Sequence, residues 1–202
     1  MLRIAVLVSG GGSNLQALLD AQNSGGLRSG KIALVVSSKE GAYALARAQD
    51  AGVETAVLAK EPGESAAGYG QRLLALLRAG GIDLVVLAGF LLILDACVIR
   101  AYAGRILNVH PSLIPAFCGQ GFYGLKVHEA ALARGVKVTG ATVHLVNEVP
   151  DGGPILAQQA VEVCEGDTPQ TLQRRVMEQA EWALLPRETE RWARKLVREA
   201  RW

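Results

Sequence analysis

Asn108 and His110 are the residues whose types and spacing most directly indicate chemistry. They lie two positions apart at the end of an apolar run that Pro111 terminates, so in a strand both side chains project from the same face. An imidazole can transfer a proton near neutral pH and an amide can donate a hydrogen bond. A lone histidine after a strand is more often structural, but the pairing with an amide favours catalysis. Asp151 stands in Asp-Gly-Gly-Pro, which alone is more often a turn.

A second candidate site is the glycine-rich segment Ser9–Asn14, which follows an apolar run and precedes a helical pattern. Free amides at a helix N-terminus bind phosphate, although a purely structural turn is the alternative. A dinucleotide fingerprint would need glycine at Leu15 and an acidic residue after the second strand, where the sequence has Ser37-Ser38-Lys39. The segment therefore favours a phosphomonoester of a nucleotide or sugar over NAD.

The elements that must position these residues alternate between apolar runs and helical patterns. Runs at 3–9, 31–36, 54–58 and 83–88 predict strands, and the segments 14–21, 42–51 and 69–78 predict helices. Strands are also expected at 105–110, 138–146 and 154–163, with a helix at 125–134 and a charged helical end from 168 that Pro186 breaks. We therefore predict an α/β fold: a doubly wound, mostly parallel, Rossmann-like sheet of about seven strands with an antiparallel C-terminal extension.

Composition limits the classes of protein that fit. The chain has 202 residues, half of them apolar, and a formal charge of +2, which suits one domain with its own core and does not mark a nucleic-acid surface. Three widely spaced cysteines form no CxxC pair, so no metal site is expected. The apolar N-terminus is too short for a signal segment, and no run is long enough to span a membrane. We expect a cytoplasmic protein.

Four blocks in order resemble the phosphoribosylglycinamide formyltransferases: Ser-Gly-x-Gly-Ser-Asn-Leu at 9–15, Leu-Ala-Gly-Phe at 87–90, Asn-x-His-Pro-Ser-Leu-x-Pro at 108–115 and Asp-Gly-Gly-Pro at 151–154. The resemblance extends from residue 1 to about 190. It implies that a formyl group passes from 10-formyltetrahydrofolate to the amine of glycinamide ribonucleotide, in purine biosynthesis. It further implies small-molecule partners without nucleic acid, membrane or metal, and a monomer or homodimer.

The resemblance also implies roles for matching residues. Asn108 would donate to the oxyanion, His110 would move the proton and Asp151 would support the imidazolium. The ribonucleotide would contact Gly12, Ser13, Asn14, Leu15 and Glu181. Compared with the family's pattern, this sequence has one extra residue before Glu181. The folate would lie against Leu91, Leu92, Ile93, Leu94, Asn108, Asn147, Glu148, Val149, Pro150 and Asp151. Residues 1–100 would form the phosphoribosyl half of a single domain, and residues 101–202 the folate and catalytic half.

The sequence departs from this family near the folate tail. Leu92 and Ala66 stand where arginines are common, and Lys126 is a candidate replacement. The loop 118–124 is longer than in well-known relatives. It is expected to be either a flap that closes on the folate side or a plain surface connector. His144 is expected to be structural, with a supporting role beside Asp151 as the alternative, and His128 is expected to be exposed on its helix.

Three competing functions share features with this interpretation. A formyltetrahydrofolate hydrolase would keep Asn108, His110 and Asp151 but usually carries an N-terminal regulatory domain, and a methionyl-tRNA formyltransferase would need a further C-terminal domain. A nucleotide-binding module without enzymatic activity would use only the glycine-rich turn. It would not need the Asn-His-Asp set.

Overall fold

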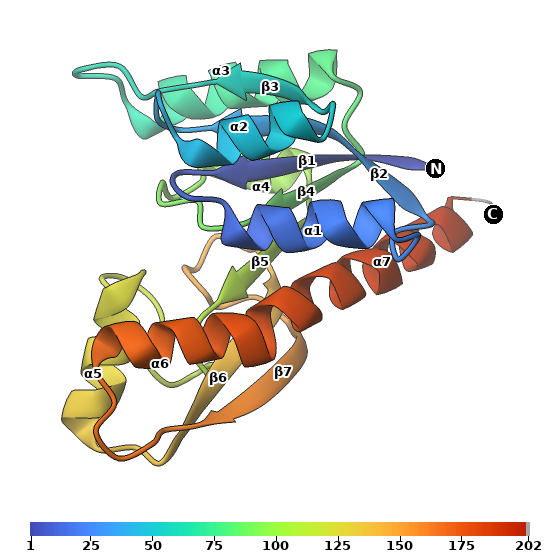
Figure 1. Ribbon diagram of the computed structural model, residues 1–202. Coiled ribbons are helices and arrows are strands. Elements are labelled where there is room, and N and C mark those ends of the chain that lie inside the picture. Colours follow the sequence, from blue (N-terminus) through green and yellow to red (C-terminus); the bar gives the residue numbers. More distant parts are fainter. Residues whose placement is uncertain (201–202) are drawn as a thin grey trace.

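The computed structural model describes residues 1–200, in which five apolar segments form a parallel sheet (Figure 1). These strands are β1 (Leu2–Val8), β2 (Gly30–Ser37), β3 (Glu54–Val57), β4 (Leu84–Leu87) and β5 (Ile106–His110). Their middle members are apolar on both faces because helices cover both sides of the sheet. Two antiparallel strands, β6 (Val138–Leu145) and β7 (Ile155–Glu162), complete the order β3-β2-β1-β4-β5-β6-β7. The predicted fold class is confirmed.

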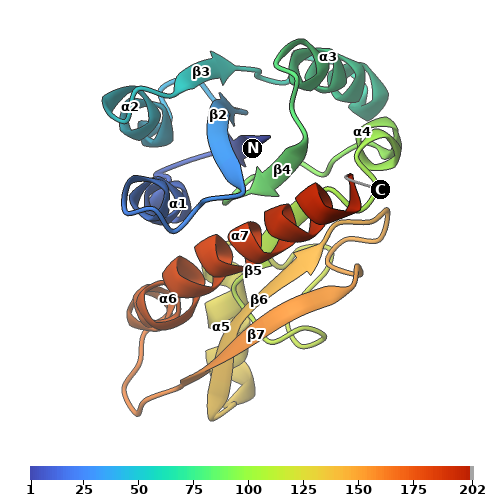
Figure 2. The same ribbon diagram turned by 90° about the vertical axis from the view of Figure 1, so that its right-hand side faces the viewer.

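Helices pack against the two faces of the sheet as separate groups (Figure 2). One core lies between the sheet and α1 (Ser13–Asn23), α2 (Tyr43–Asp50), α6 (Pro169–Val176) and α7 (Trp182–Glu199), with α5 (Leu125–Arg134) beside α6. The other lies between the sheet and α3 (Ala66–Ala79) and α4 (Ala96–Ala101). The sequence analysis did not predict α4, because six residues are too few for a periodic pattern. Its start is marked only by Asp95, whose carboxylate accepts from the Cys97 amide.

The predicted break at Pro186 is wrong. The helix continues through α6, the π-helix η1 (Met177–Glu181) and α7 as one rod that crosses the sheet (Figures 1 and 2). Pro186 lies in the second turn of α7, where it is accommodated without ending the helix. No helix within residues 1–200 has the length and apolarity that a membrane crossing requires.

The expectation that His128 is exposed is also wrong. Its side chain is fully buried in α5, and neither ring nitrogen has a hydrogen-bond partner within residues 1–200. Burial, assisted by the charge of nearby His110, lowers the pKa of His128 to about 4. The ring is therefore a neutral core side chain at physiological pH.

Candidate active site

A cleft of about 400 Å³ opens at the carboxyl ends of β4 and β5. The strand order reverses between β1 and β4 nearby, and ligands of doubly wound sheets bind at such a reversal. Three loops and one strand end supply most of its wall, in residues 89–94, 108–111, 119–124 and 146–151. Every residue predicted to contact the folate lines this cleft.

Asn108 and His110 project together into the cleft, as their spacing predicts. The antiparallel neighbour β6 places His144 opposite Asn108 and Thr142 opposite His110. His144 is buried, and both its ring nitrogens are paired, as expected of a structural histidine. Its Nδ1 donates to the Leu145 carbonyl at 2.9 Å, so its Nε2 accepts from Asn108 Nδ2 at 3.1 Å. His144 thereby also orients the Asn108 amide.

The Asp151 carboxylate joins these side chains from the loop before β7. Oδ2 lies 3.4 Å from His110 Nδ1 and accepts from the Gly119 amide at 2.9 Å. Oδ1 lies 3.5 Å from both His144 Nε2 and Asn108 Nδ2. Burial alone would raise the pKa of Asp151, but the charge of His110 and the hydrogen bond from the Gly119 amide help to lower it below its ordinary value. The group is therefore ionised at neutral pH.

The state of His110 follows from its partners. Its Nε2 lies 2.8 Å from the Phe117 carbonyl, which can only accept, so Nε2 carries a hydrogen. In the neutral ring, Nδ1 then presents a lone pair to the Asp151 carboxylate, whereas the imidazolium presents an N–H. Burial lowers the pKa of His110, and Asp151 and Phe117 oppose that shift. The pair can therefore take up and release a proton at Nδ1.

The Phe117 carbonyl was not predicted as part of the site. It lies in the loop after β5, and Phe117 adopts a positive φ of 49°. A main-chain group leaves no residue-type signal in a sequence, so no pattern marked it.

The glycine-rich segment forms the turn between β1 and α1, as predicted. Two contacts from α2 hold it: the Ala44 amide donates to Gly10 O at 3.1 Å, and Arg47 Nε donates to Gly11 O at 2.9 Å. Gly12 has φ 73°, and a Cβ there would lie 2.6 Å from the Ala44 Cβ, so this close approach requires glycine. The first N–H groups of α1 have no partners within their helix and can bind an anion.

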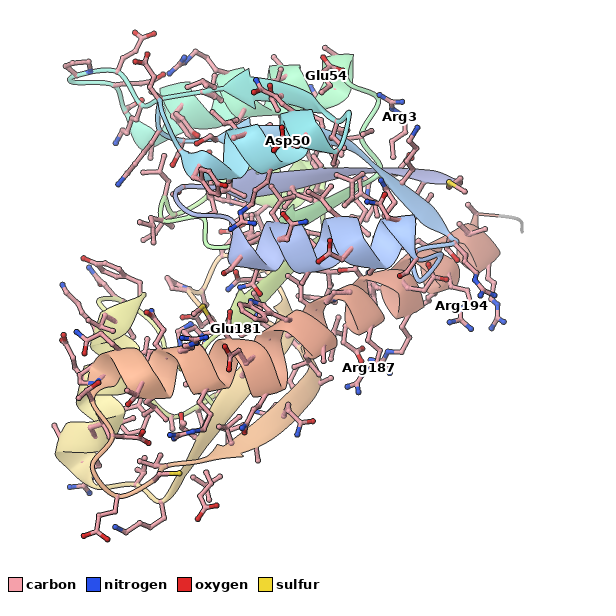
Figure 3. All side chains as sticks on the ribbon, in the orientation of Figure 1. Arg3, Asp50, Glu54, Glu181, Arg187 and Arg194 are labelled. Atoms are coloured by element: carbon pink, nitrogen blue, oxygen red, sulfur yellow. The ribbon has the colours of Figure 1, made fainter. Side chains whose placement is uncertain are left out.

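Glu181, labelled on the long C-terminal helix in Figure 3, is hydrogen-bonded to Asn14 of α1. Glu181 is 6% exposed and accepts from Asn14 Nδ2 at 2.5 Å, while Asn14 Oδ1 has no partner within residues 1–200. The extra residue expected before Glu181 coincides with the π-helix Met177–Glu181, which absorbs one residue per turn. The Leu15 side chain is fully buried in the core, so this residue offers only its backbone to a ligand.

The glycine-rich turn and Glu181 do not line the cleft, although the loop after β4 connects to the turn. The Leu91 amide donates to Ser9 Oγ at 2.9 Å, and Ser9 Oγ lies 2.6 Å from Ser38 Oγ. Ala66 lies in the first turn of α3, also outside the cleft wall. Within residues 1–200, no group of three or more histidine, cysteine, aspartate or glutamate side chains could hold a metal ion.

Replacing Glu181 by glutamine is expected to flatten one part of the pH dependence of stability. Burial raises the pKa of Glu181 from 4.5 to about 7, against the Asn14 hydrogen bond. The folded state therefore holds this proton more tightly, and stability falls as pH rises from about 4.5 to 7. A shift of this size corresponds to about 3 kcal/mol.

Urea unfolding at pH 5 and pH 8 measures this effect. Glu181→Gln should be more stable than the parent by about 3 kcal/mol at pH 8 and by little at pH 5. A difference that does not change between the two pH values would contradict the buried, proton-retaining carboxyl.

Comparison with known proteins places this geometry in a family. The formyl transferase family model matches residues 2–188. The chain is 40% identical to a phosphoribosylglycinamide formyltransferase of Escherichia coli, covering 92% of this chain and 84% of that protein. It is 41% identical to a chloroplastic phosphoribosylglycinamide formyltransferase of Arabidopsis thaliana, over 87% of this chain but only 60% of the plant protein's length.

A solved structure shows the same arrangement of elements. Glycinamide ribonucleotide transformylase 1 of Symbiobacterium toebii superposes with a TM-score of 0.90 at 42% identity, covering 96% of this chain and 89% of that one. The chain belongs to the formyl transferase family and, within it, to the phosphoribosylglycinamide formyltransferases.

Proposed function

We propose that the chain transfers a formyl group from 10-formyltetrahydrofolate to the amine of glycinamide ribonucleotide. The observation that carries this proposal is the Asn108–His110–Asp151 cluster in the wall of a largely apolar cleft. Family membership supports the reaction class.

The chemistry needs one nucleophilic attack and one proton relocation. The amine forms a bond to the formyl carbon, and the C=O electron pair moves to oxygen. Asn108 donates to that oxyanion, which is worth about 3 kcal/mol per donor in comparable sites. The bond to N10 of the folate then breaks, and the proton that the amine loses reaches N10 through His110. Asp151 stabilises the imidazolium between these events.

The ribonucleotide is proposed to bind beside the cleft. The α1 N-terminus, with the backbone of Gly12, Ser13, Asn14 and Leu15, would hold the phosphate. Glu181 and the unpaired Asn14 Oδ1 would bind ribose hydroxyls. The N-terminal half would thus bind the phosphoribosyl group, while the amine reaches the cleft past the turn at Ser9.

The folate is proposed to occupy the cleft in the C-terminal half. The pterin would face residues 147–151 on one side. On the other side it would face Leu91, Leu92, Ile93 and Leu94. Main-chain carbonyls and amides of both segments can pair with the ring's donors and acceptors. A cytoplasmic location and a monomeric or homodimeric state remain predictions from the sequence.

A spectrophotometric assay tests the function and separates it from its competitors. With 10-formyltetrahydrofolate as donor, folate product should appear only when glycinamide ribonucleotide is present. Product formed equally without the ribonucleotide would mean that water is the acceptor, as in a hydrolase. No turnover in either case, with ribonucleotide binding retained, would favour the non-enzymatic binding module.

A further inference from the structure

A single hydrogen bond joins the two proposed substrate sites. Residues 89–94 form one wall of the cleft, and the Leu91 amide in this segment donates to Ser9 Oγ at 2.9 Å. Ser9 is the first residue of the glycine-rich segment that leads into α1. Among the hydrogen bonds of residues 1–200, this is the only one that links residues 89–94 to another part of the chain. The proposed folate wall is therefore tied to the proposed phosphate site at one atom.

The two ends of this connection differ in how firmly they are held. The turn is fixed from α2, which donates hydrogen bonds to the main-chain carbonyls of Gly10 and Gly11. In the wall segment, by contrast, Leu91 is 49% and Ile93 is 71% exposed, and Leu94 is the only buried residue of the six. A segment with few buried contacts opens easily. The wall therefore takes its position from the turn.

The connection itself is shielded from water. Ser9 is 5% exposed, and its hydroxyl oxygen lies 2.6 Å from that of Ser38, a residue that is 8% exposed and directly follows β2. A hydrogen bond in such surroundings is electrostatically stronger than one at the surface. A change in the position or bonding of Ser9 is therefore felt at Leu91.

The serine pair also leaves one hydroxyl hydrogen without a partner. Ser9 and Ser38 each carry one such hydrogen, and their mutual contact can use only one of the two. Neither hydroxyl has another acceptor within residues 1–200. Two arrangements follow from this count. Ser9 donates to Ser38, or Ser38 donates to Ser9 and the hydrogen of Ser9 is released for another acceptor.

These two arrangements respond differently to an anion at the turn. An anionic oxygen there would accept the released hydrogen and so favour the second arrangement, in which Ser9 accepts from both Leu91 and Ser38. Hydrogen bonds in a chain polarise one another, so a hydroxyl that donates is a better acceptor. A ligand can shift an equilibrium only between states that it binds differently, and the serine pair supplies two such states.

From these contacts we propose that Ser9, backed by Ser38, couples the two substrate sites, so that each substrate raises the affinity of the protein for the other. The ribonucleotide phosphate strengthens the bond that holds the wall at Leu91, and the held wall receives the folate. Ser9 is a positioning residue, because it acts on the folate through Leu91. The inference rests on the proposed function, since it takes the ribonucleotide as the ligand of the turn and the folate as the occupant of the cleft.

Equilibrium titrations with glycinamide ribonucleotide and tetrahydrofolate test the coupling, because tetrahydrofolate carries no formyl group and the two ligands cannot react. In the parent, saturating tetrahydrofolate should lower the Kd for the ribonucleotide about fivefold, and saturating ribonucleotide should lower the Kd for tetrahydrofolate by the same factor. In Ser9→Ala both factors should fall below about twofold, because the bond that carries the coupling is gone. Ser38→Ala keeps the bond from Leu91 and should give an intermediate factor.

Hydrogen exchange of the Leu91 amide gives a readout that a merely structural role of Ser9 would not move. The ribonucleotide alone, bound outside the cleft, should slow this exchange in the parent and have no effect on it in Ser9→Ala. The matched control is Ser37→Ala. Ser37 is also buried, but within residues 1–200 its hydroxyl bonds only to the main chain of Lys39, at 2.7 and 3.1 Å. Coupling and exchange in this variant should equal those of the parent.

The outcomes separate the possible failures. A parent that binds both ligands independently would overturn the coupling and leave the proposed function intact. Coupling that persists in Ser9→Ala would show that the ligands contact each other directly, and coupling lost in Ser37→Ala as well would show a general effect; either result would overturn the role of Ser9. If Ser9→Ala does not fold, a Leu91 amide whose exchange in the parent ignores the ribonucleotide would do the same. A parent that binds neither ligand would overturn the proposed function, and this inference with it.

Discussion

Asp151→Asn is expected to lower kcat for formyl transfer by about 10³-fold, within the range of a lost acid–base partner. The Phe117 carbonyl fixes the hydrogen of His110 on Nε2, so Nδ1 is the only position at which the ring can gain a proton. The Asp151 carboxylate, 3.4 Å from Nδ1, favours that proton. An asparagine amide would instead donate to Nδ1 and hold the ring neutral. The variant keeps the shape of the site and loses its proton relay.

Steady-state kinetics with saturating ribonucleotide and a pH profile of kcat measure this effect. Ribonucleotide affinity should remain within about twofold of the parent's, because the α1 N-terminus and Glu181 lie outside the cleft. Asp50→Asn removes a carboxylate of the same type at the exposed end of α2 (Figure 3) and should leave kcat unchanged. Near-normal turnover in Asp151→Asn would show that the proton does not pass through His110.

The sequence predicted best those features that repeated local patterns encode. The buried parallel strands are continuous apolar runs, and turn residues separate them from amphipathic helices. The predicted number of strands and the mostly parallel sheet with an antiparallel extension were therefore correct. The period of two along a strand placed Asn108 and His110 on one face. Asp151 gave no such signal. It follows β5 by about forty residues and joins the cluster only because β6 returns antiparallel to β5.

The features that were missed or wrong depend on tertiary contacts. His128 sits in a helix with charged neighbours, yet its side chain is completely buried in the folded chain. A proline inside a helix is expected to break it, but α7 continues through Pro186. The Phe117 carbonyl acts through its main chain, and α4 is too short for periodicity.

Gly153→Ala is expected to destabilise the protein by about 4 kcal/mol or more, which is rare for a single substitution. An added Cβ would lie 1.8 Å from the Leu145 carbonyl oxygen and 2.8 Å from its carbon. Both atoms belong to the backbone of β6, and Leu145 also donates from its amide to Pro154 O at 2.9 Å. Neither strand can move without losing this pairing.

The same displacement should reach the catalytic cluster, because Asp151 lies only two residues before Gly153. A shift of about 1 Å in a catalytic group can cost about 10²-fold in rate, so kcat should fall in any Gly153→Ala protein that folds. Gly152→Ala is the matched control. Its Cβ would lie 2.6 Å from Cγ1 and 2.8 Å from Cβ of Val149, a residue that is 62% exposed, so this surface loop rather than a strand of the sheet must shift.

Urea unfolding and kcat measured on both variants decide the matter. We expect a large loss of both quantities for Gly153→Ala and a smaller loss for Gly152→Ala. Equal stability of the two variants would mean that the loop before β7 adapts freely. In that case the Asp151 carboxylate would owe its position to the Gly119 amide and the two histidines rather than to the backbone of β6.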